Sequence, residues 1–118
     1  MAFPGTSNIS YYKGDTYEFR IYPKDSSGAV FDLSLFGNAK FTIATKRGPG
    51  ANQIEGFAQI SDDKTYITCA ILPGNSTSMV PTIQYVYDVE ITKPGTPYNF
   101  VYTLLTGTIS VTDQVTGA

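Results

Sequence analysis

Apolar and polar residues alternate along most of this chain, and turn-forming residues interrupt the alternation at short intervals. The longest alternating run, residues 83–92, carries Ile, Tyr or Val at every odd position. Successive side chains of a β-strand point to opposite faces, so a period of two predicts a strand with one buried face. We therefore expect residues 83–92 to form a central strand of an all-β fold.

Shorter runs of the same kind predict the remaining strands. They comprise residues 9–12, 16–23, 38–47, 53–60, 65–72 and 98–111. The turn Lys13-Gly14-Asp15 predicts that the first two of these runs pair as a hairpin. Gly56 and Gly107 stand inside predicted strands, where glycine usually marks a bulge or a close backbone approach. At Gly107 we expect a bend or a bulge.

The strands and their connections predict one sandwich with short tails. Residues 73–81 contain polar caps and bounding prolines, which predict one short helical turn near residues 75–79 between two sheets. About seven short strands without a helix of ordinary length are typical of a single immunoglobulin-like antiparallel β-sandwich. We expect this sandwich to span residues 9–112. Turn-forming residues predict an N-terminal arm over residues 1–8, and residues 113–118 are expected to form a C-terminal tail.

The composition of the 118-residue chain favours one β-rich domain that contacts other proteins. Charged residues make up 15% of the chain, below the roughly 25% of an average soluble domain, and aromatic residues make up 14%. Protein interfaces favour Tyr and are depleted in Lys and Glu. The net charge of −2 comes from scattered single charges, so there is no basic stripe to neutralise a nucleic-acid backbone. We expect protein partners and no nucleic acid.

The sequence offers few groups for catalysis or metal binding. It contains no His, which is the commonest general base and the commonest zinc ligand. The pairs Asp62-Asp63 and Asp88 with Glu90 are expected in a turn and on the polar face of a strand, and no aspartate spacing resembles an EF-hand. We therefore predict no enzymatic activity, no catalytic or metal-binding residues and no cofactor. Cys69 has no disulfide partner, and its strand context predicts a buried thiol.

The ends of the chain show no targeting signal. The first residues lack the basic and apolar regions of a signal peptide, and no run approaches the roughly 18 apolar residues of a membrane span. We expect synthesis in a cytoplasm and no membrane association.

Aromatic residues outside the predicted core are the candidate interface. Those expected to contact a partner are Phe3, Tyr11, Tyr12, Tyr22 and Tyr98. An alternative use of such rings is a platform for sugars, because aromatic faces stack on pyranose rings. That alternative requires several of Tyr11, Tyr12, Tyr22, Tyr66 and Tyr98 to share one face.

Five segments, in this order, resemble a module of tailed-phage particles. They are YKGDTYEF at residues 12–19, DSSG at 25–28, FDLS at 31–34, YVYDVEI at 85–91 and LTGTISV at 105–111. The corresponding pattern is a Gly-Asp-Thr strand, an Asp-x-x-Gly turn, an Asp-Leu-Thr crossover, a Tyr-x-Tyr-Asp-Leu strand and a final Gly-Thr-Val-x-Val strand. It is similar to the small immunoglobulin-like virion domain also seen at the N-terminus of siphophage upper baseplate proteins. The likeness covers most of residues 10–113.

This resemblance implies a non-catalytic structural protein of a virion, made in the host bacterial cytoplasm and present in multiple copies per particle. Its partners would be capsid, tail or baseplate subunits. Unlike the baseplate proteins, the sequence has no C-terminal extension for a receptor-binding domain or a coiled coil, so we expect an accessory domain, such as a capsid decoration. The alternative is a carbohydrate-binding module that assists host adsorption through weak glycan binding.

Overall fold

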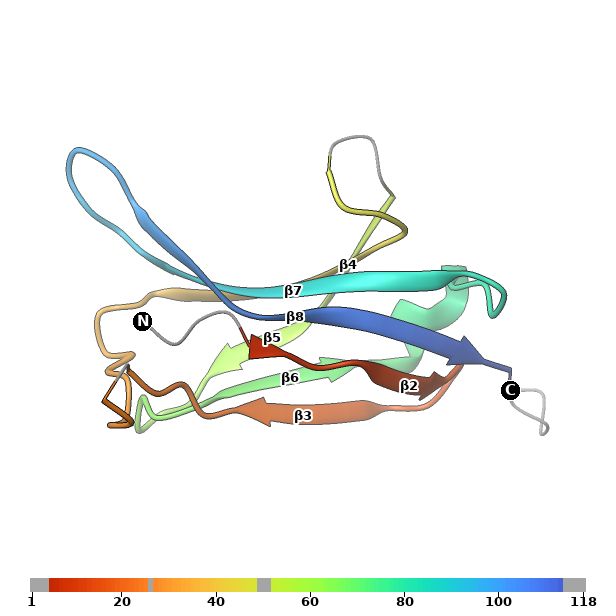
Figure 1. Ribbon diagram of the computed structural model, residues 1–118, viewed down its shortest axis with the longest axis horizontal. Helices are drawn as coiled ribbons and strands as arrows, with labels where there is room; N and C mark the ends of the chain where they lie inside the picture. Colours follow the sequence, from red (N-terminus) through yellow and green to blue (C-terminus); the bar gives the residue numbers. More distant parts are fainter. Residues whose placement is uncertain (1–4, 26, 49–51, 114–118) are drawn as a thin grey trace.

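Strands dominate the computed structural model, which describes residues 5–25, 27–48 and 52–113 (Figure 1). The elements are β1 (Gly5–Thr6), β2 (Ile9–Tyr12), β3 (Tyr17–Ile21), β4 (Asn38–Ala44), β5 (Gln53–Ile60), β6 (Ile67–Ile71), the 3₁₀ helix η1 (Pro73–Ser78), β7 (Gln84–Lys93) and β8 (Phe100–Thr112). The predicted all-β class is confirmed. The described residues form eight strands rather than about seven, because residues 5–6 add a short one.

The strands form one curled, mixed sheet. The order is β1-β8-β7-β4-β5-β6-β3, and β2 also pairs with β8. β1 and β2 run parallel to β8, whereas all other neighbouring strands are antiparallel. The prediction of a purely antiparallel sheet was therefore wrong at this edge. In Figure 1 the sheet curls so that β7 and β8 lie above β6 and β3, with the core between them.

β5 joins the two layers at Gly56. The first half of β5 pairs with β4, up to Gly56 opposite Phe41, and the second half pairs with β6 from Phe57 onward. A Cβ atom on Gly56 would lie 2.5 Å from Phe41 Cδ2 and 3.1 Å from the Ala70 carbonyl oxygen. The predicted close backbone approach at Gly56 is confirmed, and only glycine fits this crossing without displacing its neighbours.

The predicted hairpin between residues 9–12 and 16–23 was wrong. β2 pairs with β8, β3 pairs with β6, and the segment between them crosses from one layer to the other. Gly14 adopts a φ of 95° in this crossing, and its N–H donates to Ser76 Oγ at 3.0 Å. The alternation of residues identified both strands correctly but carried no information about their partners.

β7 is the central strand that the sequence predicted. It lies between β8 and β4, and its inward residues Tyr85, Tyr87, Val89 and Ile91 are buried. The ring of Tyr87 meets that of Phe41 edge to face, with the centroids 5.5 Å apart. Such aromatic pairs add about 0.5–1.5 kcal/mol beyond the burial of their area. This face of β7 therefore anchors the core.

The connection between β6 and β7 is the short helical turn that the sequence predicted. η1 spans Pro73–Ser78, close to the expected residues 75–79. The Asn75 side chain accepts a hydrogen bond from the backbone N–H of Leu72 at 2.8 Å, which closes the start of the turn. η1 thus connects β6, in one layer, to β7, in the other.

Substitution of Gly56 tests the crossing of β5. We expect Gly56→Ala to lower the free energy of unfolding by about 2 kcal/mol, because the new methyl group overlaps Phe41 and cannot be accommodated in a packed core. Gly37→Ala is the control, since a Cβ there has no neighbour within 4 Å. Urea denaturation of the three proteins measures the difference. Equal losses for both variants would show that the crossing does not require glycine.

Cys69 provides a second test of the core. Its side chain is fully buried, and burial raises the pKa of the thiol to about 12. The thiolate is the reactive form, so we expect the native protein to resist alkylation at pH 8.5 and the urea-unfolded protein to react at once. Because the folded pKa is raised, this group's contribution to stability is complete below the unfolded pKa of about 8.5 and is lost as the pH rises towards the folded value. Rapid labelling of the native protein at pH 8.5 would contradict the burial of Cys69.

Candidate interaction site

The first described residues form an edge strand along β8. β1 and β2 keep the same register on β8, with Gly5 opposite Leu105 and Ile9 opposite Ile109. Ser7 and Asn8 leave the strand conformation between them without shifting that register. The predicted arm over residues 1–8 is therefore, from Gly5 onward, part of the sheet. Turn-forming residues there mark an interruption in a paired strand.

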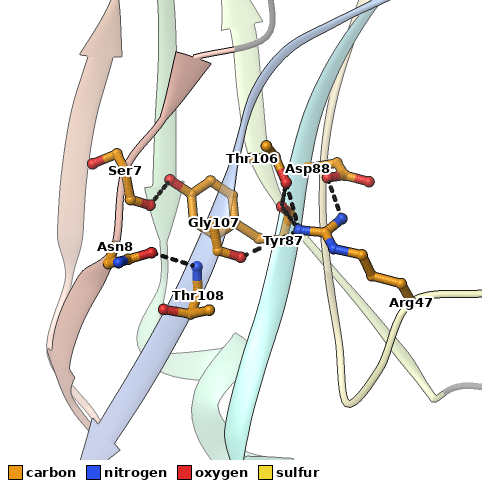
Figure 2. A network of polar contacts seen from close by, with 8 residues as sticks. All are labelled: Ser7, Asn8, Arg47, Tyr87, Asp88, Thr106, Gly107 and Thr108. Atoms are coloured by element: carbon orange, nitrogen blue, oxygen red, sulfur yellow. Dashed lines mark hydrogen bonds and ion pairs between the residues drawn. The ribbon is translucent and has the colours of Figure 1, made fainter.

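The interruption at Ser7 is built on Gly107 and Tyr87. The Ser7 carbonyl group turns over Gly107, where a Cβ atom would overlap it. The buried Tyr87 hydroxyl donates a hydrogen bond to this carbonyl oxygen at 2.6 Å (Figure 2). The Ser7 N–H donates to the Thr106 carbonyl oxygen at 3.0 Å. Burial raises the pKa of Tyr87 because it disfavours the phenolate, so the donor form is maintained. The predicted bulge at Gly107 is corrected: glycine serves a close approach there.

The register shift of β8 lies at a different position. Val89 is opposite Leu105, but Glu90 is opposite Thr103, so Leu104 is the additional residue. Leu104 is buried, so the irregularity turns an apolar side chain inward. This irregularity is distinct from the bend or bulge predicted at Gly107, which lies three residues further along β8.

The Asn8 side chain serves as a hydrogen-bond acceptor for β8 where the N-terminal segment leaves the strand conformation. Its Oδ1 accepts a hydrogen bond from the Thr108 N–H at 3.2 Å (Figure 2). A buried or half-buried N–H without a partner is costly, and Asn is a residue that readily bonds to backbone groups. The Ser7-Asn8 pair therefore satisfies the β8 backbone while the N-terminal segment bends.

Arg47 tethers the same region from the other side. Its Nη1 donates to Asp88 Oδ1 at 2.7 Å, and its Nη2 donates to Thr106 Oγ1 and, at 3.4 Å, to the Tyr87 carbonyl oxygen (Figure 2). Asp88, which was expected with Glu90 on the polar face of a strand, thus forms an ion pair with Arg47. Exposed ion pairs contribute up to about 1 kcal/mol. The network orders the segment after β4 against β7 and β8.

An open seam separates the two ends of the curled sheet. We use this name for the hollow of about 340 Å³ lined by Ser7, Ile9, Tyr17, Phe19, Arg20, Ile21, Tyr22, Tyr87 and Leu105. β3 is the last strand at one end of the order, and within the described ranges no strand pairing joins it to β1 or β2. Its inward residues Tyr17, Phe19 and Ile21 consequently remain only half-buried. On one side of the sandwich β5 connects the two layers, and on the other side the seam lies between β3 and the N-terminal segment.

The predicted interface tyrosines do not gather on one face. Tyr12, Tyr22 and Tyr98 are 57%, 55% and 63% exposed, but Tyr11 is only 1% exposed. Tyr11 therefore belongs to the core: it lies at an inward position of β2, and its hydroxyl donates to the Asp15 carbonyl oxygen at 2.7 Å. Phe3 lies outside the described residues.

Two of the three exposed tyrosines, Tyr22 and Tyr98, lie in separate aromatic clusters. Tyr22 lies beside Tyr66, with ring centroids 5.3 Å apart and a tilt of 42°, and the Arg20 guanidinium lies 4.7 Å from the Tyr66 centroid. Tyr98 lies 5.4 Å from Phe100 in the hairpin between β7 and β8. The sugar alternative requires several of the five tyrosines to share one face; Tyr11 is buried, Tyr22 and Tyr66 are neighbours, and Tyr98 lies in the other cluster.

The turn aspartates are used to close turns. Asp25 Oδ1 accepts hydrogen bonds from Ser27 and from the Ala29 N–H, and Asp63 Oδ1 accepts from Ser61 and Thr65. These hydrogen bonds, chiefly those from the Ser27 and Thr65 side chains, lower the pKa of both carboxyl groups. In the described part of the chain, His, Cys, Asp and Glu side chains do not come together in threes as a metal site requires. None of the described helices is long and apolar enough to span a membrane.

No family model matches the chain, and no curated protein matches it. Sequence reasoning missed Ser7, Asn8 and the free edge of β3. The sequence signal for Ser7 and Asn8 was Gly107, because a glycine inside a strand can mark the close approach of another backbone. The edge of β3 had no local signal, because it depends on which strands pair.

Removal of the Tyr87 hydroxyl tests the anchoring of the N-terminal segment. We expect Tyr87→Phe to lower the free energy of unfolding by about 1 kcal/mol, because the Ser7 carbonyl loses its donor in a half-buried position. The Ser7 amide should also exchange faster with solvent, since its bond to Thr106 loses support. Tyr12→Phe is the matched control on an exposed ring and should change stability by less than about 0.5 kcal/mol. Denaturation and amide exchange measure both effects, and unchanged Ser7 exchange in Tyr87→Phe would contradict this anchoring.

Proposed function

We propose that this protein is a non-catalytic structural component of a tailed-phage virion, an accessory immunoglobulin-like domain bound to capsid, tail or baseplate subunits. The observation that carries the proposal is an exposed strand edge, β3, beside an apolar seam. Free edges and apolar hollows are surfaces through which proteins contact other proteins. The low charge and the high Tyr content favour the same use.

The segments that resemble the phage module have defined structural roles in this chain. Gly14 and Gly28 adopt φ values of 95° and 88° in the two turns, and Asp25 closes the second turn through its carboxylate. The segment of residues 85–91 lies in the central strand β7, and Gly107 admits the Ser7 backbone. The motif residues thus support the scaffold, which is consistent with a role in which the surface makes the contacts.

Particle composition tests this proposal. We expect mass spectrometry of purified particles of the encoding phage to detect the protein in stoichiometric, multiple copies, together with capsid, tail or baseplate subunits. Alanine at all three exposed tyrosines, Tyr12, Tyr22 and Tyr98, should weaken rebinding to particles that lack the protein by about tenfold or more. Leu35→Ala, at an exposed aliphatic residue, is the control and should bind normally. Absence of the protein from purified particles would overturn the proposal.

A carbohydrate-binding module remains the second candidate, and the observation that favours it is the Tyr22–Tyr66 pair with Tyr22 exposed. Arg20 lies over the Tyr66 ring, so of these two rings the exposed Tyr22 is the one that a sugar could stack on. Titration with millimolar sugars, followed through the Tyr22 ring signals, separates the two candidates. Saturable shifts that disappear in Tyr22→Ala would favour glycan binding, and unchanged spectra would exclude it for the sugars used.

A further inference from the structure

β3 carries two opposite charges on its outward face. Glu18 and Arg20 are exposed and flank the half-buried Phe19. On one side β3 is paired with β6, and within the described ranges its other side has no strand partner. In Figure 1, β3 forms the lower border of the molecule. Such an edge presents unpaired backbone N–H and C=O groups to an incoming strand.

We propose that the β3 edges of two copies of this chain pair antiparallel about Phe19, so that Glu18 of each copy faces Arg20 of the other. A two-fold axis at Phe19 places each residue opposite the residue equally far on the other side of Phe19. The same axis produces two identical Glu–Arg pairs, because the contact is isologous. Directly opposed unlike charges stabilise antiparallel strands.

The charges also select this register against its neighbours. An axis at Glu18 would oppose the two Glu18 side chains, and an axis at Arg20 would oppose the two Arg20 side chains. Both arrangements place like charges opposite each other, which is destabilising. An axis between two residues would set an inward side chain against an outward one and disrupt both faces. Of these axes, the one at Phe19 opposes unlike charges on the outer face.

The same pairing would bring apolar side chains on the inner face of the two β3 strands into contact. Tyr17 and Ile21 would lie opposite each other across the axis, and Phe19 would meet its own copy. These three residues are half-buried at the open seam, so a second strand would extend the apolar row that β3 presents. Aromatic and β-branched cross-strand pairs are among the favourable ones in sheets.

Arg20 is held in place for this contact. Its guanidinium lies over the Tyr66 ring at 4.7 Å from the centroid, and Tyr66 in turn packs against Tyr22. Cation–π stacking keeps the side chain on the outer face of β3, the face on which the proposed pairing places Glu18 of the second copy. The side chain therefore loses little conformational freedom when a partner arrives.

Charge reversal tests the dimer. Sedimentation analysis of the wild-type protein at micromolar to high micromolar concentrations should show a monomer–dimer equilibrium. Glu18→Arg and Arg20→Glu should each raise the dissociation constant about tenfold or more, because each converts two attractive pairs into two repulsive ones. The double variant, which exchanges the two charges, should restore dimerisation. An equimolar mixture of the two single variants should form a heterodimer, because every opposed pair is then attractive.

Two controls separate this contact from a general effect of charge or of lost packing. Glu55→Arg reverses an exposed charge on β5, where the strand pairs with β4 and the Glu55 carbonyl oxygen accepts a hydrogen bond from Asn75, and should leave the equilibrium unchanged. Arg20→Lys keeps the charge and should retain dimers even if the stacking on Tyr66 weakens. A wild-type protein that remains monomeric at high micromolar concentration would overturn the proposal. So would dimers that are insensitive to both single reversals. Neither result bears on the virion assignment, which the particle composition tests separately.

Discussion

The parallel pairing of the N-terminal segment with β8 is the constraint on which the rest of the structure depends. The segment could reach β3 only through a tight hairpin, and instead it follows β8 in one register from Gly5 to Tyr12. Where the segment bends, the Ser7 carbonyl oxygen accepts a hydrogen bond from the buried Tyr87 hydroxyl. The same carbonyl lies over Gly107, which has no side chain to obstruct it. Because this segment pairs with β8, the edge of β3 away from β6 has no strand partner among the described residues.

The two sides of the sandwich are consequently unequal. On one side β5 passes between the layers at Gly56, and the Phe41 ring that contacts it is fully buried. On the other side the seam leaves Phe19 half-buried, although its ring meets Phe41 at 5.5 Å. Apolar area that stays in water forgoes roughly 25 cal/mol per Å² of stabilisation. A partner strand at this edge would recover part of that free energy, which is the physical basis of the contact proposed above.

Local pattern was sufficient to place the strands. The run at residues 53–60 coincides with β5, the odd residues from Tyr85 to Ile91 are buried as predicted, and Cys69 lies in the core. Ile83, predicted on the same face, is exposed and lies outside β7. The alternation did not predict which strands pair with each other, because strand pairing depends on contacts between residues far apart in the sequence, such as Ser7 with Tyr87. Tyr11 illustrates the same difficulty: it has the residue type of an interface, and only the position of β2 on β8 turns it inward.

The central claim is that β2 pairs with β8 and leaves the outer edge of β3 free, and interstrand proton–proton contacts measured by NMR test it most directly. The account predicts contacts typical of parallel strands between residues 9–12 and residues 109–112, such as Ser10 with Ser110. It also predicts antiparallel contacts of Phe19 with Cys69 of β6. Antiparallel contacts between residues 9–12 and Tyr17–Ile21, with loss of those to β8, would contradict it.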